Sequence, residues 1–308
     1  MHKYIIKRFL MMIPVLLGVI FIMFTLSAIT PGDPAQMVLA EGATPEMIEA
    51  QREIMGLNDP FLVRFFNYVV GVVQGDFGDS WQTRRPVTEE IFARFPTTMQ
   101  LAGMGIILAL LIGIPLGILS AVKQYSPMDV GATVFALLGV SIPNFWLGLL
   151  FIMLFTVLLG WLPATGFDSP AQWIMPTLAI MTASASIIMR MTRSSMLECI
   201  RQDYIRTARA KGQKESKVIF RHALKNALIP VTTTAGLSFG ALLGGAVLTE
   251  TIFAVPGLGR FMVESIGLRD WPMVFGGVLL IATSFSLVNL LVDILYAFLD
   301  PRIRSQYS

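Results

Sequence analysis

Six stretches of the sequence are apolar over about 20 residues each, the length that an α-helix needs to cross a bilayer. Only 14% of the residues are charged, whereas soluble domains carry about 25%. We therefore predict an all-α integral membrane protein with six transmembrane helices. The stretches are residues 9–29, 98–122, 132–159, 174–191, 230–252 and 273–298.

The first stretch predicts a membrane helix that is retained in the mature protein. It is longer than the ~7–15 apolar residues of a secretory signal core, and no A-x-A-like cleavage site follows it. His2, Lys3, Lys7 and Arg8 precede it.

Several classes of chemistry are excluded by residue types that the chain lacks. The single cysteine, Cys199, rules out an intrachain disulfide and a metal site of several cysteines. No G-x-x-x-x-G-K-[ST] phosphate-binding loop occurs, and neither histidine, His2 or His222, lies near a partner for a Ser/His/Asp triad. We predict no catalytic residue and no metal site, and expect that the chain is not an enzyme.

The distribution of the 23 Lys and Arg residues predicts the orientation in the membrane. Cytoplasmic loops carry an excess of these residues. With a cytoplasmic N-terminus, most of them lie inside, and six spans return the C-terminus to the cytoplasm. The cations left outside are Arg52, Arg64, Arg84, Arg85, Arg94, Arg260 and Arg269.

The long segment 30–97 predicts a helical external subdomain, which divides the chain into residues 1–29, 30–97 and 98–308. It holds ten of the 20 carboxylates. Two pairs in which a capping residue precedes proline, Thr44-Pro45 and Asp59-Pro60, indicate helix starts, with ends at Gly56 and Gly75. A disordered loop is the alternative, which the aromatic content of the segment disfavours.

The third stretch contains "SIPNFW", residues 141–146. Proline removes a helix hydrogen bond, so Pro143 should kink or break this span. A broken helix in a bilayer requires protein or a water-filled cavity to satisfy its freed backbone groups. Pro143 and Asn144 are therefore candidates for a transport pathway, although a structurally neutral proline kink remains the alternative.

A basic segment precedes the fifth stretch. Seven of the 23 cations lie between residues 203 and 225. We predict a helix over 203–210 that ends at Gly212, then a second helix over 214–228, before Pro230 starts the next span. On the second helix, Lys214, Lys217, Arg221 and Lys225 share one face. Phe220, Leu224, Leu228, Ile219, Ala223 and Ala227 share an adjoining apolar face.

Three roles compete for this segment. Its cations could hold the loop inside and contact anionic lipid. They could bind nucleic acid, but no aromatic stacking platform accompanies them. We favour a docking element for a cytoplasmic protein, whose groove would take the apolar face.

The sequence resembles a family at this point. "YIRTARAKG" at 204–212 and "RHALKNALIP" at 221–230 look like the EAA loop of permeases in ATP-binding-cassette (ABC) importers, in the form found in the dipeptide, oligopeptide and nickel family. The glutamate of the general pattern is absent, since Arg206, Thr207 and Ala208 occupy the Glu-Ala-Ala positions. Further similar segments are "PGDP" at 31–34, "GDFGDS" at 75–80, "RRPV" at 84–87, "RMTRSSMLE" at 190–198, "PGLGR" at 256–260 and "DPRIR" at 300–304.

The resemblance implies a type I ABC importer permease fold in a bacterial inner (plasma) membrane. It also implies a second homologous permease, two cytoplasmic ATPases that bind ATP and Mg, and an extracytoplasmic binding protein as partners. The chain itself would hold no cofactor and bind no nucleic acid. The coupling loop would span about residues 192–229, and its ATPase-docking positions would be Tyr204, Arg206, Thr207, Ala208, Arg209, Ala210, Lys211 and Gly212.

The predicted function is that of a permease subunit that forms half of a pathway for di- or oligopeptides. Nickel, a metal chelate or glutathione are alternative cargoes of the same architecture. A stand-alone secondary carrier or channel is the alternative of another class, but no relay of ionisable residues near the membrane midplane supports it. Asp293 and Glu250 are ionisable residues near the ends of their spans.

Overall fold

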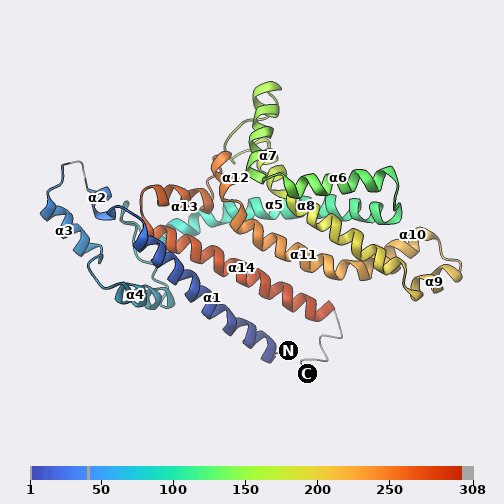
Figure 1. Cartoon of the computed structure of the whole chain (residues 1–308), viewed down its shortest axis with the longest axis horizontal. Helices are drawn as coiled ribbons and strands as arrows, with labels where there is room; N and C mark the ends of the chain where they lie inside the picture. Colours follow the sequence, from blue (N-terminus) through green and yellow to red (C-terminus); the bar gives the residue numbers. More distant parts are fainter. Residues whose placement is uncertain (1, 40–41, 300–308) are drawn as a thin grey trace.

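A computed structural model describes residues 2–39 and 42–299 of the chain, almost all of them in helices (Figure 1). Five helices contain apolar windows long enough to cross a membrane: α1 (His2–Ile29), α5 (Val87–Val122), α8 (Pro170–Ile200), α11 (Leu224–Gly245) and α14 (Trp271–Leu299). A bent pair of helices forms the sixth candidate span. The predicted all-α membrane fold is therefore confirmed, while "DPRIR" lies outside the described residues.

Helix α8 is the centre of the bundle and packs against α5, α11 and α6. Two glycines of α5 allow its close approach to α8, because a Cβ on Gly113 would lie 2.7 Å from the Ala185 carbonyl oxygen and one on Gly117 would lie 2.5 Å from Cβ of Thr192. Small residues at such crossings are typical of membrane helices, whose backbones can then pack closely.

The third span is broken where the sequence predicts it. Helices α6 (Pro127–Ser141) and α7 (Asn144–Phe151) meet at Pro143, and the two halves of the span differ in direction by 103°. A π-helix, η1 (Ile152–Leu158), continues α7. In Figure 1, α7 stands out from the side of the bundle.

The second and fifth spans differ from the predicted ranges. Helix α5 begins at Val87 and not near residue 98, so it reaches into the 30–97 segment. The fifth span runs over Glu215–Gly245, and α12 (Val247–Ile252) is a separate helix. Pro230 lies inside α11 rather than at its start. The chain tolerates proline there, and Thr234 Oγ1 donates a hydrogen bond to the Pro230 carbonyl at 2.9 Å.

The 30–97 segment forms the two predicted helices, α3 (Pro45–Ile54) and α4 (Phe61–Val73), and a further short helix, α2 (Pro34–Val38), that was not predicted. Thr44 caps α3 by accepting a hydrogen bond from the Met47 amide at 3.3 Å. The start of α4 differs from the prediction, because Pro60 occupies the cap position and Asp59 makes no capping hydrogen bond. Gly56 and Gly75 adopt the left-handed conformation after the two helices.

These helices are fastened to the bundle by aromatic packing and one carboxylate. Phe24 of α1 stacks on Phe275 of α14 at 4.6 Å, and Tyr68 of α4 contacts both rings. Asp270, which follows α13 (Leu258–Gly267), accepts hydrogen bonds from Ser80 Oγ at 2.5 Å and from the Trp81 amide at 2.9 Å. The "GDFGDS" segment is thus held to the start of α14.

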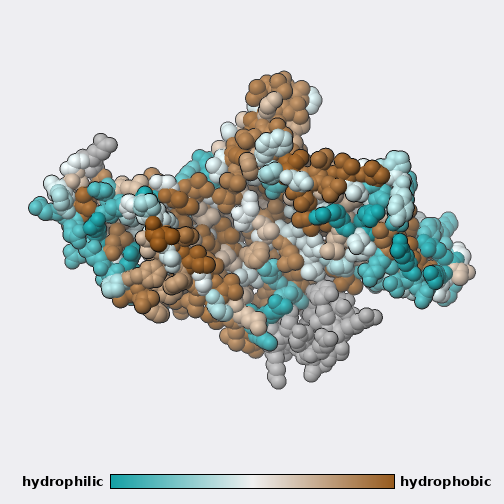
Figure 2. Space-filling model, viewed as in Figure 1, coloured by the Kyte–Doolittle hydropathy of each residue, from teal (hydrophilic) through white to brown (hydrophobic). Residues whose placement is uncertain are grey.

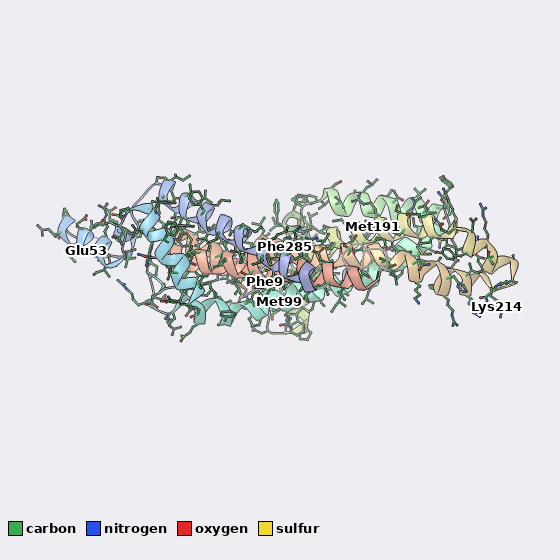
Figure 3. The ribbon with its side chains drawn as sticks, turned by 90° about the horizontal axis from the view of Figure 1, so that it is seen from below. Phe9, Glu53, Met99, Met191, Lys214 and Phe285 are labelled. Carbon is green, nitrogen blue, oxygen red and sulfur yellow. The ribbon has the colours of Figure 1, made fainter. Side chains whose placement is uncertain are left out.

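Hydrophilic residues gather at the two ends of the visible face, with mostly hydrophobic residues between them (Figure 2). Helices α2–α4 lie at one end, and α9 (Asp203–Ala210) and α10 (Glu215–Lys217) at the other. The view from below places Glu53 and Lys214 at opposite ends (Figure 3). This distribution is expected of a bundle that crosses an apolar layer.

Candidate functional site

The basic hairpin, residues 203–225, connects the end of α8 to the start of α11. Helix α9 begins after Gln202 and ends at Ala210, as predicted. Gly212 follows with φ of +71°, a conformation that glycine adopts without steric cost. The chain then turns back through α10 and a second π-helix, η2 (Val218–Ala223), which leads directly into α11.

The apolar face of the hairpin is packed inside the chain. Ile205 and Ala208 of α9 contact a buried cluster with Val218, Ile219 and Met196. The second helix therefore does not offer the predicted apolar face to a partner, because the ends of α5 and α8 already cover most of it. Phe220 is predicted to lie on the same apolar face, but the structure leaves it 61% exposed.

Seven of the eight predicted docking residues are exposed on the hairpin. Ala208 is the exception, since its side chain is buried at 9% exposure and serves packing between α9 and η2. A Cβ added at Gly212 would meet no atom within 4 Å. The exposed residues are Tyr204, Arg206, Thr207, Arg209, Ala210, Lys211 and Gly212.

Two of the cations on the hairpin are engaged within it. Arg209 pairs with Glu215 at 2.6 Å, and this hydrogen bond raises the pKa of the Arg209 guanidinium. Arg206 pairs with Asp203 at 3.5 Å. The other five are exposed, and their side chains form no hydrogen bond or ion pair with any residue that the structure describes: Lys211, Lys214, Lys217, Arg221 and Lys225. The hairpin thus offers a cationic surface.

Tyr204 links the start of α9 to α11, since its hydroxyl accepts a hydrogen bond from Asn226 Nδ2 at 3.0 Å. His222 is half-buried and lies 3.3 Å from Gln213 Oε1. Both contacts hold the two arms of the hairpin in a fixed arrangement.

A largely buried ion pair joins α8 to the α5–α6 turn, ten residues before the start of α9. The Arg193 guanidinium contacts both carboxylate oxygens of Asp129, at 2.8 and 3.0 Å. Ser120 Oγ donates to the same carboxylate, and the Tyr125 amide donates to it at 2.9 Å. We call this the Asp129 clasp. The sequence does not reveal this pairing, and its one local signal is the lone carboxylate at the start of the third span.

The ionisable residues singled out near the ends of the spans are both engaged. Asp293 pairs with Arg8 of α1 at 3.0 Å. Glu250 is fully buried and accepts hydrogen bonds from Thr98 Oγ1 at 2.7 Å and from the Arg260 amide at 2.9 Å. The "PGLGR" segment wraps around this carboxylate, because a Cβ on Gly257 would lie 2.3 Å from Glu250 Cδ.

The pathway candidates lie at the break between α6 and α7. Pro143 is exposed and Asn144 is half-exposed, and Asn144 forms no side-chain hydrogen bond within the described residues. Across residues 2–39 and 42–299, no group of three or more His, Cys, Asp or Glu side chains could hold a metal ion.

Comparison with known proteins agrees with this arrangement. Residues 113–305 match the family described as "Binding-protein-dependent transport system inner membrane component", and residues 1–102 match its N-terminal counterpart. The dipeptide transport system permease protein DppB of Alkalihalophilus pseudofirmus is 44% identical over 99% of this chain and 100% of its own length. The glutathione transport system permease protein GsiC of Escherichia coli K12 is 43% identical over 99% of both chains.

Solved structures show the same fold at low sequence identity. An inward-facing form of the MetNI methionine ABC transporter matches with a TM-score of 0.58 and 19% identity, over 69% of this chain and 97% of that chain. An amino acid ABC transporter matches with a TM-score of 0.53 and 16% identity, over 70% of this chain and 94% of that chain. Proteins of the matched family are membrane permeases and not enzymes. The chain belongs to the family of inner membrane components of binding-protein-dependent transport systems, the permease subunits of peptide ABC importers.

Proposed function

We propose that this permease carries di- or oligopeptides inward, with its basic hairpin and both termini on the cytoplasmic side of a bacterial inner membrane. The proposal is supported by the relative named as a dipeptide permease, which matches over its whole length. Glutathione is the second candidate, because relatives named as glutathione permeases are 43–45% identical.

We propose the basic hairpin as the coupling site for a cytoplasmic ATPase that binds ATP and Mg. The observation that carries this role is the exposed surface of five cations, next to the end of the central helix α8, whose side chains pair with no described residue. A rigid connection from this surface into α8 and α11 would let closure of the ATPases move both helices as bodies. A second homologous permease would complete the pathway.

Purification from mild detergent tests the assembly. Co-purification of ATPase subunits and a second permease is expected. Recovery of a form of this chain that transports in the absence of any ATPase would contradict the proposal.

The cargo is tested on the reconstituted importer and its cognate binding protein. Calorimetry should show capture of di- or oligopeptides, and ATP should drive their uptake into proteoliposomes. Capture of glutathione alone would favour the second candidate, and capture of a nickel chelate alone would contradict both.

A further inference from the structure

Two cavities adjoin at the α2–α4 end of the molecule. One has a volume of about 270 Å³ and the other of about 570 Å³. Arg64 of α4 and Trp81 lie in the walls of both. Asn67 faces the smaller cavity, whereas Gln36 and Asn58 face the larger one. We call the pair of cavities the Arg64 cleft.

Arg64 is half-buried, and its guanidinium forms no hydrogen bond or ion pair with any residue in the described part of the chain. Burial lowers the pKa of its guanidinium, and the charge of Asp59 acts in the opposite direction without direct contact. An arginine nevertheless stays protonated at neutral pH. The cleft therefore contains a positive charge and five N–H donors without a partner.

The other arginine in the cleft differs in this respect. Arg52 is bound to Asp33 at 2.8 Å and to Glu49 at 3.2 Å. A half-buried charge without such partners is unfavourable in the isolated chain. This contrast indicates that the partner of Arg64 comes from outside the chain.

The cleft opens away from the apolar side of α4. At 100° per residue, Phe66 lies about 160° and Val70 about 120° around this helix from Arg64. Phe66 and Val70 are more than half exposed, as expected of residues that face lipid tails. The geometry therefore favours a ligand from the aqueous side over a lipid head group.

We propose that the Arg64 cleft receives a carboxylate side chain of the binding protein on which the transport system depends. The inference rests on the proposed orientation, which puts α2–α4 outside. Guanidinium and carboxylate form paired, charge-assisted hydrogen bonds, which suit a docking contact of fixed geometry. The family description itself requires a binding protein as partner.

Two acidic residues in the walls of the cleft predict a second effect on docking, opposite in sign to that of Arg64. Asp59 and Asp79 lie in the smaller cavity, and neither pairs with Arg64. Their charges oppose an incoming carboxylate, since like charges repel across a partly dry site. Arg64→Glu should therefore weaken docking, and Asp59→Asn should strengthen it.

The test uses the complete importer in nanodiscs and its cognate binding protein, with the dissociation constant measured by biolayer interferometry. Arg64→Glu should raise this constant at least tenfold, and Arg64→Lys should raise it about threefold because the forked geometry is lost. Asp59→Asn should lower it about twofold to threefold. Arg84→Glu is the matched control, because Arg84 is exposed outside the cleft, and it should leave the constant unchanged.

Each outcome has a distinct meaning. If the wild-type importer does not bind the binding protein, the proposed function fails. If it binds and Arg64→Glu binds equally well, the inference alone is overturned. Normal docking of Arg64→Glu, together with loss of a co-purified phospholipid in native mass spectrometry, would instead assign Arg64 to a lipid head group.

Discussion

Gly212 shows how one residue sets the shape of the basic hairpin. A Cβ added at Gly212 would meet no neighbouring atom, so lack of space does not explain the glycine. The backbone φ of +71°, which glycine adopts most easily, explains it. Gly257 differs, because the Glu250 carboxylate fills the space that a Cβ would need. Gly212 and Gly257 are thus required for different physical reasons.

Substitutions at Gly212 separate backbone strain from docking. Gly212→Ala should destabilise the turn by about 1–2 kcal/mol, the usual penalty of left-handed backbone. Gly212→Asn should be milder, because asparagine tolerates this region. Gly212→Asp should abolish transport and uncouple ATP hydrolysis while membrane insertion continues, measured by uptake and by ATPase stimulation. Normal uptake by Gly212→Asp would remove this residue from the docking surface.

At the scale of elements, α8 is held to its neighbours by two kinds of contact. The glycines of α5 permit close packing along its length, and the Asp129 clasp joins it to the α5–α6 turn. Because α8 leads directly into α9, a displacement of the hairpin would be passed to α5 and α6 through this clasp.

Breaking the clasp should affect both stability and coupling. Arg193→Gln removes the cation from the clasp, while Ser120 and the Tyr125 amide still donate to the Asp129 carboxylate. We expect a loss of about 1.5–3 kcal/mol, the range for a hydrogen bond to a charged group. We expect a lower unfolding temperature and more ATP hydrolysed per substrate transported. The double variant Asp129→Arg with Arg193→Asp should recover part of both.

Arg190→Gln is the control for the clasp, since Arg190 is exposed on the same helix. A loss of stability with an unchanged ratio of ATP to substrate would show that the clasp is structural only.

The α5–α8 contact should respond to a single methyl group. Gly117→Ala should destabilise the protein by about 1–3 kcal/mol through overpacking. Gly103→Ala, in the same helix but with no atom within 4 Å of the added Cβ, should be neutral. Thermal unfolding in detergent compares the two, and equal unfolding temperatures would refute the packing argument.

At the scale of the whole molecule, the polar ends and the apolar middle imply opposite exposure of Glu53 and Lys214 (Figure 3). In a Cys199→Ala background, Lys214→Cys should react with a membrane-impermeant maleimide only from the cytoplasmic side. Glu53→Cys should react only from outside. Labelling of whole cells and of inverted vesicles measures this, and the reverse pattern would invert the proposed topology.

The local features of the fold could be predicted because local rules govern them. Thr44 caps its helix, Pro143 breaks its span, and Gly212 ends α9 as its sequence context indicated. The sequence predicts that a partner covers the apolar face of the hairpin. In the structure Met196 and Ile118 pack against that face, a contact between distant segments that the sequence alone does not show. The docking role of the seven exposed residues stays a prediction.

The sequence by itself determined that the chain is a bundle of membrane-spanning helices with a cationic hairpin and a polar subdomain, because span length, hydropathy and charge are read within short windows. Only the tertiary structure decided which charges are compensated. Asp129 meets Arg193 across 64 residues and Thr98 meets Glu250 across 152, while Arg64 meets none among the described residues. Such pairings depend on how distant helices pack, and no local pattern records them.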